Sequence, residues 1–148
     1  MSAVPAARLA EAQRHLSAGR QLAALADALS AGVGHLGSTA DPAGWLMVMY
    51  HYVLVHYLKA LEKVRAVENR SHRDRLAWLR GEADLRTIET PYSTCHDLSR
   101  TARYEGGSPL AASKTAFIHD FARVRDVAIA RLTAVGVQPV TKIEANIP

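Results

Sequence analysis

The sequence contains few of the residues that build cross-links, metal clusters or β-sandwiches. It has one cysteine, Cys95, in 148 residues, which excludes an intramolecular disulfide and a multi-thiolate zinc site. Aromatic residues make up only 6% of the chain, and no apolar run reaches the roughly 20 residues of a membrane span. The first residues contain no apolar segment of the signal-peptide kind. These absences predict a soluble, cytoplasmic protein with no part in the membrane.

What is present favours one helical domain. Hydrophobic residues, alanine prominent among them, make up 49% of the chain, enough for a core of its own at this length. The net charge of +4 is too small to indicate a partner. Five arginines do gather between Arg65 and Arg80, beside two carboxylates. This basic neighbourhood is either a solvated turn with ion pairs or a site for a polyanion.

The apolar residues recur at helical spacing, and no stretch alternates convincingly at the period of a strand. We therefore expect an all-α, up-and-down bundle of four to five helices. The predicted helices cover residues 5–30, 42–67, 72–83, 91–103 and 109–135, with a glycine-containing loop over 31–41. The second helix is apolar around much of its circumference, so it is predicted to lie at the centre of the bundle.

Local signals define the ends of these helices. Asp41 precedes Pro42, which predicts an N-cap followed by a first-turn proline. Ser71 and Asp74 resemble a capping box, and the pairs Thr90-Pro91 and Ser108-Pro109 repeat the cap-then-proline pattern. Gly136 suits the position just after a helix C-terminus, whereas Gly19 predicts a kink or break near residues 17–19. Residues 137–148 contain prolines and no helical period, and we expect an extended tail that is docked or loose.

The stretch YHYVLVHYLKAL, residues 50–61, carries two histidines in an otherwise apolar helix. His51 and His56 are separated by roughly 140° around a helix, so they cannot easily bind one metal ion, and we expect no metal site and no cofactor. His56 is expected to be partly buried, hydrogen-bonded and influenced by the ammonium of Lys59. Cys95 is predicted to be a small buried side chain. The sequence has no G-x-S-x-G, P-loop or G-x-G-x-x-G motif.

The same stretch resembles the second-helix signature of HEPN domains, a family of small helical, nucleotide- and RNA-associated proteins. The partial match comprises Tyr52, Val55, His56, Lys59, Ala60 and Leu61. Ser71-His72 is similar to the start of the family's next short helix, and SRTARY, residues 99–104, to a later segment. The resemblance spans about residues 42–135. It implies one HEPN-like helical domain over residues 1–136, followed by the tail 137–148.

The resemblance also implies a homodimer, and in catalytic members a metal-independent RNase. Those members carry R-x(4–6)-H, in which imidazole moves a proton and guanidinium holds phosphate. Arg65 and His72 have this spacing and are the catalytic candidates. The match is incomplete, because Ala66 follows the arginine where the family has a polar residue and the pair lies early in the chain.

Arg100, Arg103 and Tyr104 are the candidate ligand-binding residues, since the two arginines share a helix side. They could contact phosphate while the tyrosine stacks or hydrogen-bonds. In the alternative, Tyr104 packs under the last helix and Arg103 pairs with one of its carboxylates. If the resemblance holds, His56 converges with Arg103 and Tyr104 in a polar pocket, and it completes the binding candidates.

Three functional hypotheses follow. The preferred one is a non-catalytic HEPN-like binding or assembly module that contacts a nucleotide, RNA or a partner protein. The alternative is an RNase, such as a toxin or phage-defence effector, using Arg65 and His72. The third is an unrelated helical scaffold. Whether the protein is an enzyme is left open, because one bundle fold supports many functions.

Overall fold

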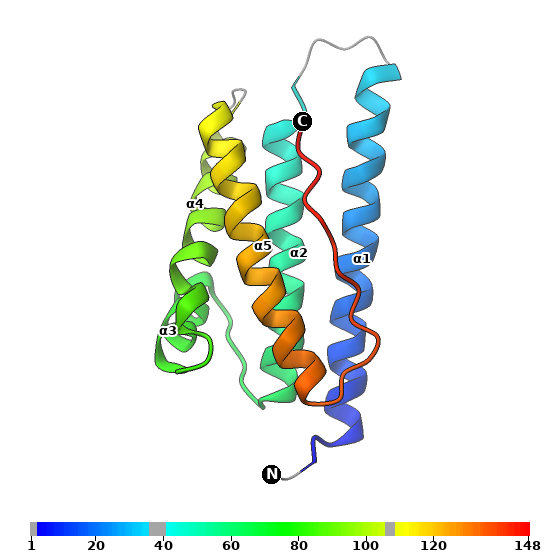
Figure 1. Ribbon diagram of the computed structural model, residues 1–148, viewed down its shortest axis with the longest axis vertical. Coiled ribbons are helices and arrows are strands. Elements are labelled where there is room, and N and C mark those ends of the chain that lie inside the picture. The colour runs from blue at the N-terminus through cyan, green and yellow to red at the C-terminus, as the bar shows by residue number, and fades with distance from the viewer. Residues whose placement is uncertain (1–2, 36–40, 106–108) are drawn as a thin grey trace.

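The computed structural model describes residues 3–35, 41–105 and 109–148, and within them the fold is all-α (Figure 1). This confirms the predicted helical bundle. The described residues form five α-helices and one short 3-10 helix and contain no strand. These elements are α1 (Ala6–His35), α2 (Ala43–Val64), α3 (His72–Gly81), η1 (Arg86–Ile88), α4 (Glu89–Glu105) and α5 (Ala111–Ala134).

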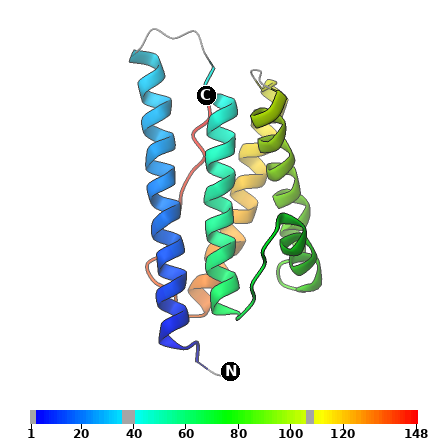
Figure 2. The same ribbon diagram turned by 180° about the vertical axis from the view of Figure 1, so that it is seen from behind.

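Helix α2 is the central element of the bundle, as its apolar circumference predicts. It packs against α1, α4 and α5, and fifteen of its 22 residues are buried. Viewed from behind, it lies between α1 on one side and α3 with α4 on the other (Figure 2). Asp41 Oδ1 accepts a hydrogen bond from the backbone N–H of Ala43 at 2.9 Å, but the helix begins at Ala43 with Pro42 at the N-cap position, one residue later than predicted.

Helix α1 is longer than the sequence predicts. It is helical without interruption from Ala6 to His35, so the expected break near residues 17–19 and the expected loop over residues 31–35 are both wrong. Residues 36–40 of that loop lie outside the described part. Glycine suits position 19, because the Cβ of any other residue there would lie only 3.3 Å from the Cβ of His56. Its small size lets α1 approach α2 closely, which compensates for its low helix propensity.

The predicted ends of the later helices are partly correct. The Ser71–Asp74 capping box is confirmed, with Asp74 N donating to Ser71 Oγ at 3.0 Å and Ser71 N donating to Asp74 Oδ2 at 3.1 Å. Thr90 is not an N-cap, because the turn of η1 runs directly into α4 at Glu89. Ser108, the other expected cap, lies outside the described residues.

Helix α5 ends at the predicted glycine. Gly136 has φ +85, and its N–H bonds to Thr133 O while that of Val137 bonds to Leu132 O, both at 3.0 Å. This pair of bonds is a Schellman motif, which favours glycine at the left-handed position.

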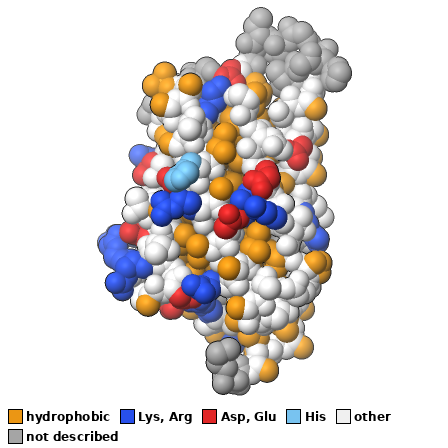
Figure 3. All heavy atoms as spheres, in the orientation of Figure 1, with side chains coloured by type: hydrophobic (Ala, Val, Ile, Leu, Met, Phe, Trp, Pro, Cys, Tyr) orange, Lys and Arg blue, Asp and Glu red, His pale blue; other side chains and the backbone are white. Residues whose placement is uncertain are grey.

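The C-terminal tail is extended and docked on the bundle. Residues 137–148 run between α1 and α5 across the face shown in Figure 1. Tyr57 of α2 donates to Thr141 O, and Arg125 of α5 donates to Ile143 O at 2.9 Å and pairs with Glu144. Although it is charged, Arg125 is only 2% exposed. The face of the molecule shown in Figure 3 carries acidic and basic side chains close together.

Candidate anion-binding cavity

A cavity of about 400 Å³ lies where α2, the start of α3 and α4 meet. One stripe of α2 forms one wall, because Val48, Tyr52, Val55 and Lys59 recur every three or four residues. His96, Arg100 and Arg103 form the α4 wall with the same helical spacing. Its volume is in the range of small-molecule sites in proteins.

The cavity is lined by cations and by no carboxylate. Its five cationic residues are Lys59, Arg70, Arg75, Arg100 and Arg103, and no Asp or Glu is among the described residues that line it. Arg75 is 5% exposed and already neutralised, since its Nε donates to Glu62 at 2.7 Å and its Nη1 to Tyr92 OH at 3.1 Å. The other four cations have no acidic partner in the part of the chain that the structure describes. The cavity is therefore attractive to anions.

Three histidines from three elements meet in the cavity. The rings of His72 (α3) and His96 (α4) stack with centroids 3.4 Å apart and an angle of 12°, and the ring of His51 (α2) lies 5.4 Å from His96. Burial, then the neighbouring imidazoles and Arg75, lower the pKa of His51 to about 3. Burial and His96 lower the pKa of His72 to about 4. Both rings are consequently neutral near pH 7.

Several polar atoms of the cavity residues lack a partner. His51 Nδ1, Asn69 Nδ2 and His72 Nδ1 are buried without a hydrogen bond, and all three residues line the cavity. Leaving a buried polar group unpaired costs about 1–3 kcal/mol, so native proteins keep few of them. Three such atoms around one cavity are what an unfilled polar site would present.

The aromatic residues of the cavity divide into floor and mouth. Tyr92 is fully buried, and its ring stacks with that of His51 at a centroid distance of 5.6 Å. Tyr52 and Tyr104 are 43% and 74% exposed and stand at the mouth. The Tyr52 hydroxyl accepts a 3.5 Å hydrogen bond from Arg103. The predicted alternative in which Tyr104 packs under the last helix is wrong.

The cavity brings together four of the six candidate residues: His72, Arg100, Arg103 and Tyr104. Arg65 lies elsewhere, at the end of α2, where its Nη1 bonds to Glu82 at 3.1 Å and its Nη2 to Asp84 at 2.6 Å. The hydrogen bond to Asp84 raises the pKa of Arg65. Through these ion pairs, Arg65 links the end of α2 to the segment after α3. It does not line the cavity that contains His72.

His56 also lies away from the cavity, on the side of α2 that faces α1. Its Nδ1 is 3.5 Å from His15 Nδ1, and burial, His15 and Lys59 lower its pKa. This agrees with the expected partial burial and the expected effect of Lys59. The expectation that His56 converges with Arg103 and Tyr104 is wrong, because His56 packs against α1 and does not line the cavity.

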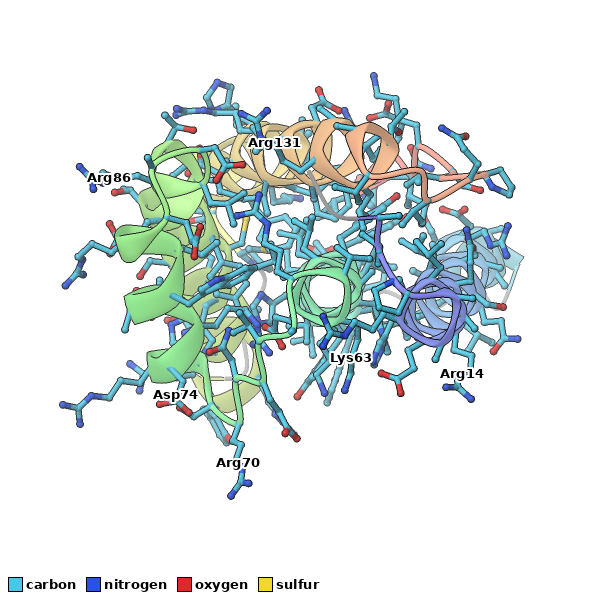
Figure 4. The ribbon with its side chains drawn as sticks, turned by 90° about the horizontal axis from the view of Figure 1, so that it is seen from below. Arg14, Lys63, Arg70, Asp74, Arg86 and Arg131 are labelled. Carbon is cyan, nitrogen blue, oxygen red and sulfur yellow. The ribbon has the colours of Figure 1, made fainter. Side chains whose placement is uncertain are left out.

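Sequence reasoning did not select His51, Arg75 or His96. Each belongs to a different helix, so no spacing along the chain connects them. The one signal in the sequence that could have indicated the cavity is the basic neighbourhood of Arg65–Arg80. The structure places its arginines in different surroundings. Arg65, Arg75 and Arg80 form ion pairs. Arg70 forms none with any residue that the structure describes, and its side chain extends away from the bundle (Figure 4).

The fold and the cavity define a class: an all-α bundle with a cation-lined cavity between its central helix and two neighbours. None of the family models, curated proteins or solved structures compared with the chain matches it. The described residues contain no group of three or more His, Cys, Asp and Glu able to hold a metal ion. No helix among them has the length and apolar character needed to span a membrane.

Proposed function

We propose that the protein is a non-catalytic, HEPN-like binding module whose α2–α3–α4 cavity holds a nucleotide or a short stretch of RNA. The observation that carries this proposal is the lining of the cavity, with five cations and no carboxylate among the described residues. Arg and Lys are the usual protein contacts to phosphate, through a planar fork and a point charge respectively.

The mouth of the cavity suits the base of such a nucleotide ligand. Tyr52 and Tyr104 present exposed rings beside Arg103. Stacking of a base on an aromatic ring is worth about 1–3 kcal/mol and tolerates any base. The same arrangement supports recognition of a nucleotide without strong sequence preference. The resemblance of residues 42–135 to HEPN domains points in the same direction.

The position of Arg65 favours binding over catalysis. Its guanidinium is held by Glu82 and Asp84, so it is not free to stabilise the charge that develops during phosphodiester cleavage. A pKa of about 4 also leaves His72 without a proton to donate near pH 7. One observation favours the RNase alternative, namely that two imidazoles, His72 and His96, stack inside a cavity that attracts phosphate.

Salt-dependent RNA binding tests the proposal. Fluorescence anisotropy of a labelled ten-nucleotide RNA is measured with the purified protein at about 50 and about 200 mM salt. If the four unpaired cations contact phosphates, the logarithmic salt slope is about −2.8 and affinity falls about 50-fold between these concentrations. Arg100→Gln/Arg103→Gln removes two contacts and reduces the loss to about 7-fold.

A charge-matched control separates site binding from general attraction. Arg8 and Arg123 are exposed and lie outside the cavity, so Arg8→Gln/Arg123→Gln should keep the wild-type salt response. Equal behaviour of the two double variants would refute the proposed cavity. The same RNA, incubated with the protein in EDTA, is then analysed on a gel. Cleavage by the wild type and not by His72→Ala would instead establish the RNase alternative.

A further inference from the structure

The further inference rests on the proposed function and concerns which phosphate the cavity receives. We propose that the cavity binds the terminal phosphomonoester of a nucleotide or RNA end, with that phosphate at the N-terminus of α3 and the rest of the ligand leaving through the mouth.

The N-terminus of α3 provides unpaired donors at the cavity. Ser71, the N-cap of α3, and His72, the first residue of this ten-residue helix, line the cavity. The capping box uses the N–H of Asp74, and the N–H of Arg75 bonds to Ser71 O at 3.1 Å. The N–H groups of His72 and Arg73 precede these bonds, and of these two residues His72 lines the cavity. A helix N-terminus with such groups favours an anion.

A second, independent observation points to a ligand at the same place. His51 is only 6% exposed, contributes to the lining, and keeps Nδ1 without a partner. His72 Nδ1 and Asn69 Nδ2 are also buried and unpaired. Together with the N–H of His72, these atoms provide several hydrogen-bonding groups for one bound oxyanion. A terminal phosphate offers three oxygens and about −1.5 to −2 charges.

The shape of the cavity favours a ligand that enters end-on. Its floor consists of residues less than 7% exposed: His51, Arg75, Tyr92 and Ser99. Exposed residues, including Tyr52, Arg100 and Arg103, surround the mouth. The buried floor and the exposed mouth place a phosphate at the inner end of the ligand, whereas an internal phosphodiester requires the chain to continue on both sides.

The nearby carboxylates do not occupy this position. Asp74 is exposed and accepts from Ser71 N at 3.1 Å, and Asp97 is exposed beside His96 at 3.2 Å. Neither lines the cavity. Glu62 is bound by Arg75. No described carboxylate lines the cavity, and the cations of the mouth border its inner end.

The experiment compares three RNAs of one sequence that differ only at their ends: both ends hydroxyl, 5′-phosphorylated and 3′-phosphorylated. Isothermal titration calorimetry measures each with the full chain. We expect one phosphorylated RNA to bind about tenfold more tightly or better than the hydroxyl form, and the better one identifies the end. Inorganic phosphate at millimolar concentration should abolish that advantage.

Two variants test whether the preference for phosphorylated RNA arises at the N-terminus of α3. His72→Leu should reduce the advantage of the phosphorylated RNA to less than about threefold, while Arg103→Gln should weaken all three RNAs by a similar factor. If His72→Leu does not fold, competition by inorganic phosphate with the wild-type protein still tests whether the cavity binds a terminal phosphate.

Equal, salt-sensitive binding of all three RNAs would overturn this inference and leave the proposed function standing. No binding of any RNA would overturn both. A preference that survives in His72→Leu, or that phosphate does not compete away, would refute the position at α3.

Discussion

The buried imidazole of His51 should make the protein less stable in mild acid. Its pKa of about 3 lies far below the roughly 6.5 of a histidine in an unfolded chain. Between these values the unfolded state binds more protons than the native state, so stability rises with pH. The contribution of His51 is complete above pH 6.5 and is lost progressively as the pH falls toward 3.

The size of this effect follows from the same two values. At about pH 5, roughly 1.5 pH units below the unfolded pKa, His51 alone lowers the free energy of unfolding by about 2 kcal/mol relative to about pH 7.5. His72 acts in the same direction, although it is only half-buried and solvent screens part of its effect. A loss of 2 kcal/mol lowers the Tm of a domain this large by about 4–8 °C.

Urea unfolding followed by circular dichroism at the two pH values measures the effect, with His51→Leu as the test variant. Leucine is similar in size and cannot titrate, so this variant should lose about 2 kcal/mol less than the wild type on acidification. His119→Leu, an exposed histidine of α5, is the control and should respond to pH as the wild type does. If His51→Leu loses as much stability as the wild type, the assignment of the acid sensitivity to His51 is refuted.

Three further changes test the fold around the cavity. Glu62→Gln leaves the charge of Arg75 buried without its ionic partner and should cost about 3–5 kcal/mol in urea unfolding, whereas Glu62→Leu/Arg75→Met should recover most of that loss. Ser71→Ala removes the cap of α3 and should cost about 1 kcal/mol in thermal unfolding; an unchanged Tm would contradict the importance of the capping box. Gly136→Ala forces alanine to φ +85 and should destabilise by about 1 kcal/mol, while Gly32→Ala, inside α1, should stabilise.

The parts of the fold that the sequence predicted depend on local signals. The spacing of apolar residues identified α2 as the central helix. The hydrogen bonds that Asp41, Ser71 and Gly136 make at the helix ends join residues two or three positions apart. The wrong predictions arose where a distant contact outweighed a local preference. Gly19 remains helical because it packs against His56, and no residue near it in the sequence indicates this.

The cavity was only partly predictable for the same reason. Arg100, Arg103 and Tyr104 share one helix, so their proximity follows from helical geometry alone. His51, His72 and His96 meet only after α2, α3 and α4 have packed, and neither composition nor spacing carries that information. The burial of Arg125 likewise depends on Ile143 and Glu144 of the tail.

The docked tail also constrains the order in which this molecule can fold. It joins residues that are very far apart in the chain: Gln13 with Gln138, 125 positions away, and Asp27 with Asn146, 119 positions away. Helices α1 and α2 can associate early because a short connection separates them. The tail closes the largest loop in the molecule, so its docking is the step least favoured by chain entropy and belongs at the end of assembly. During synthesis, α1 therefore lacks its contacts with the tail until residues 137–148 have left the ribosome.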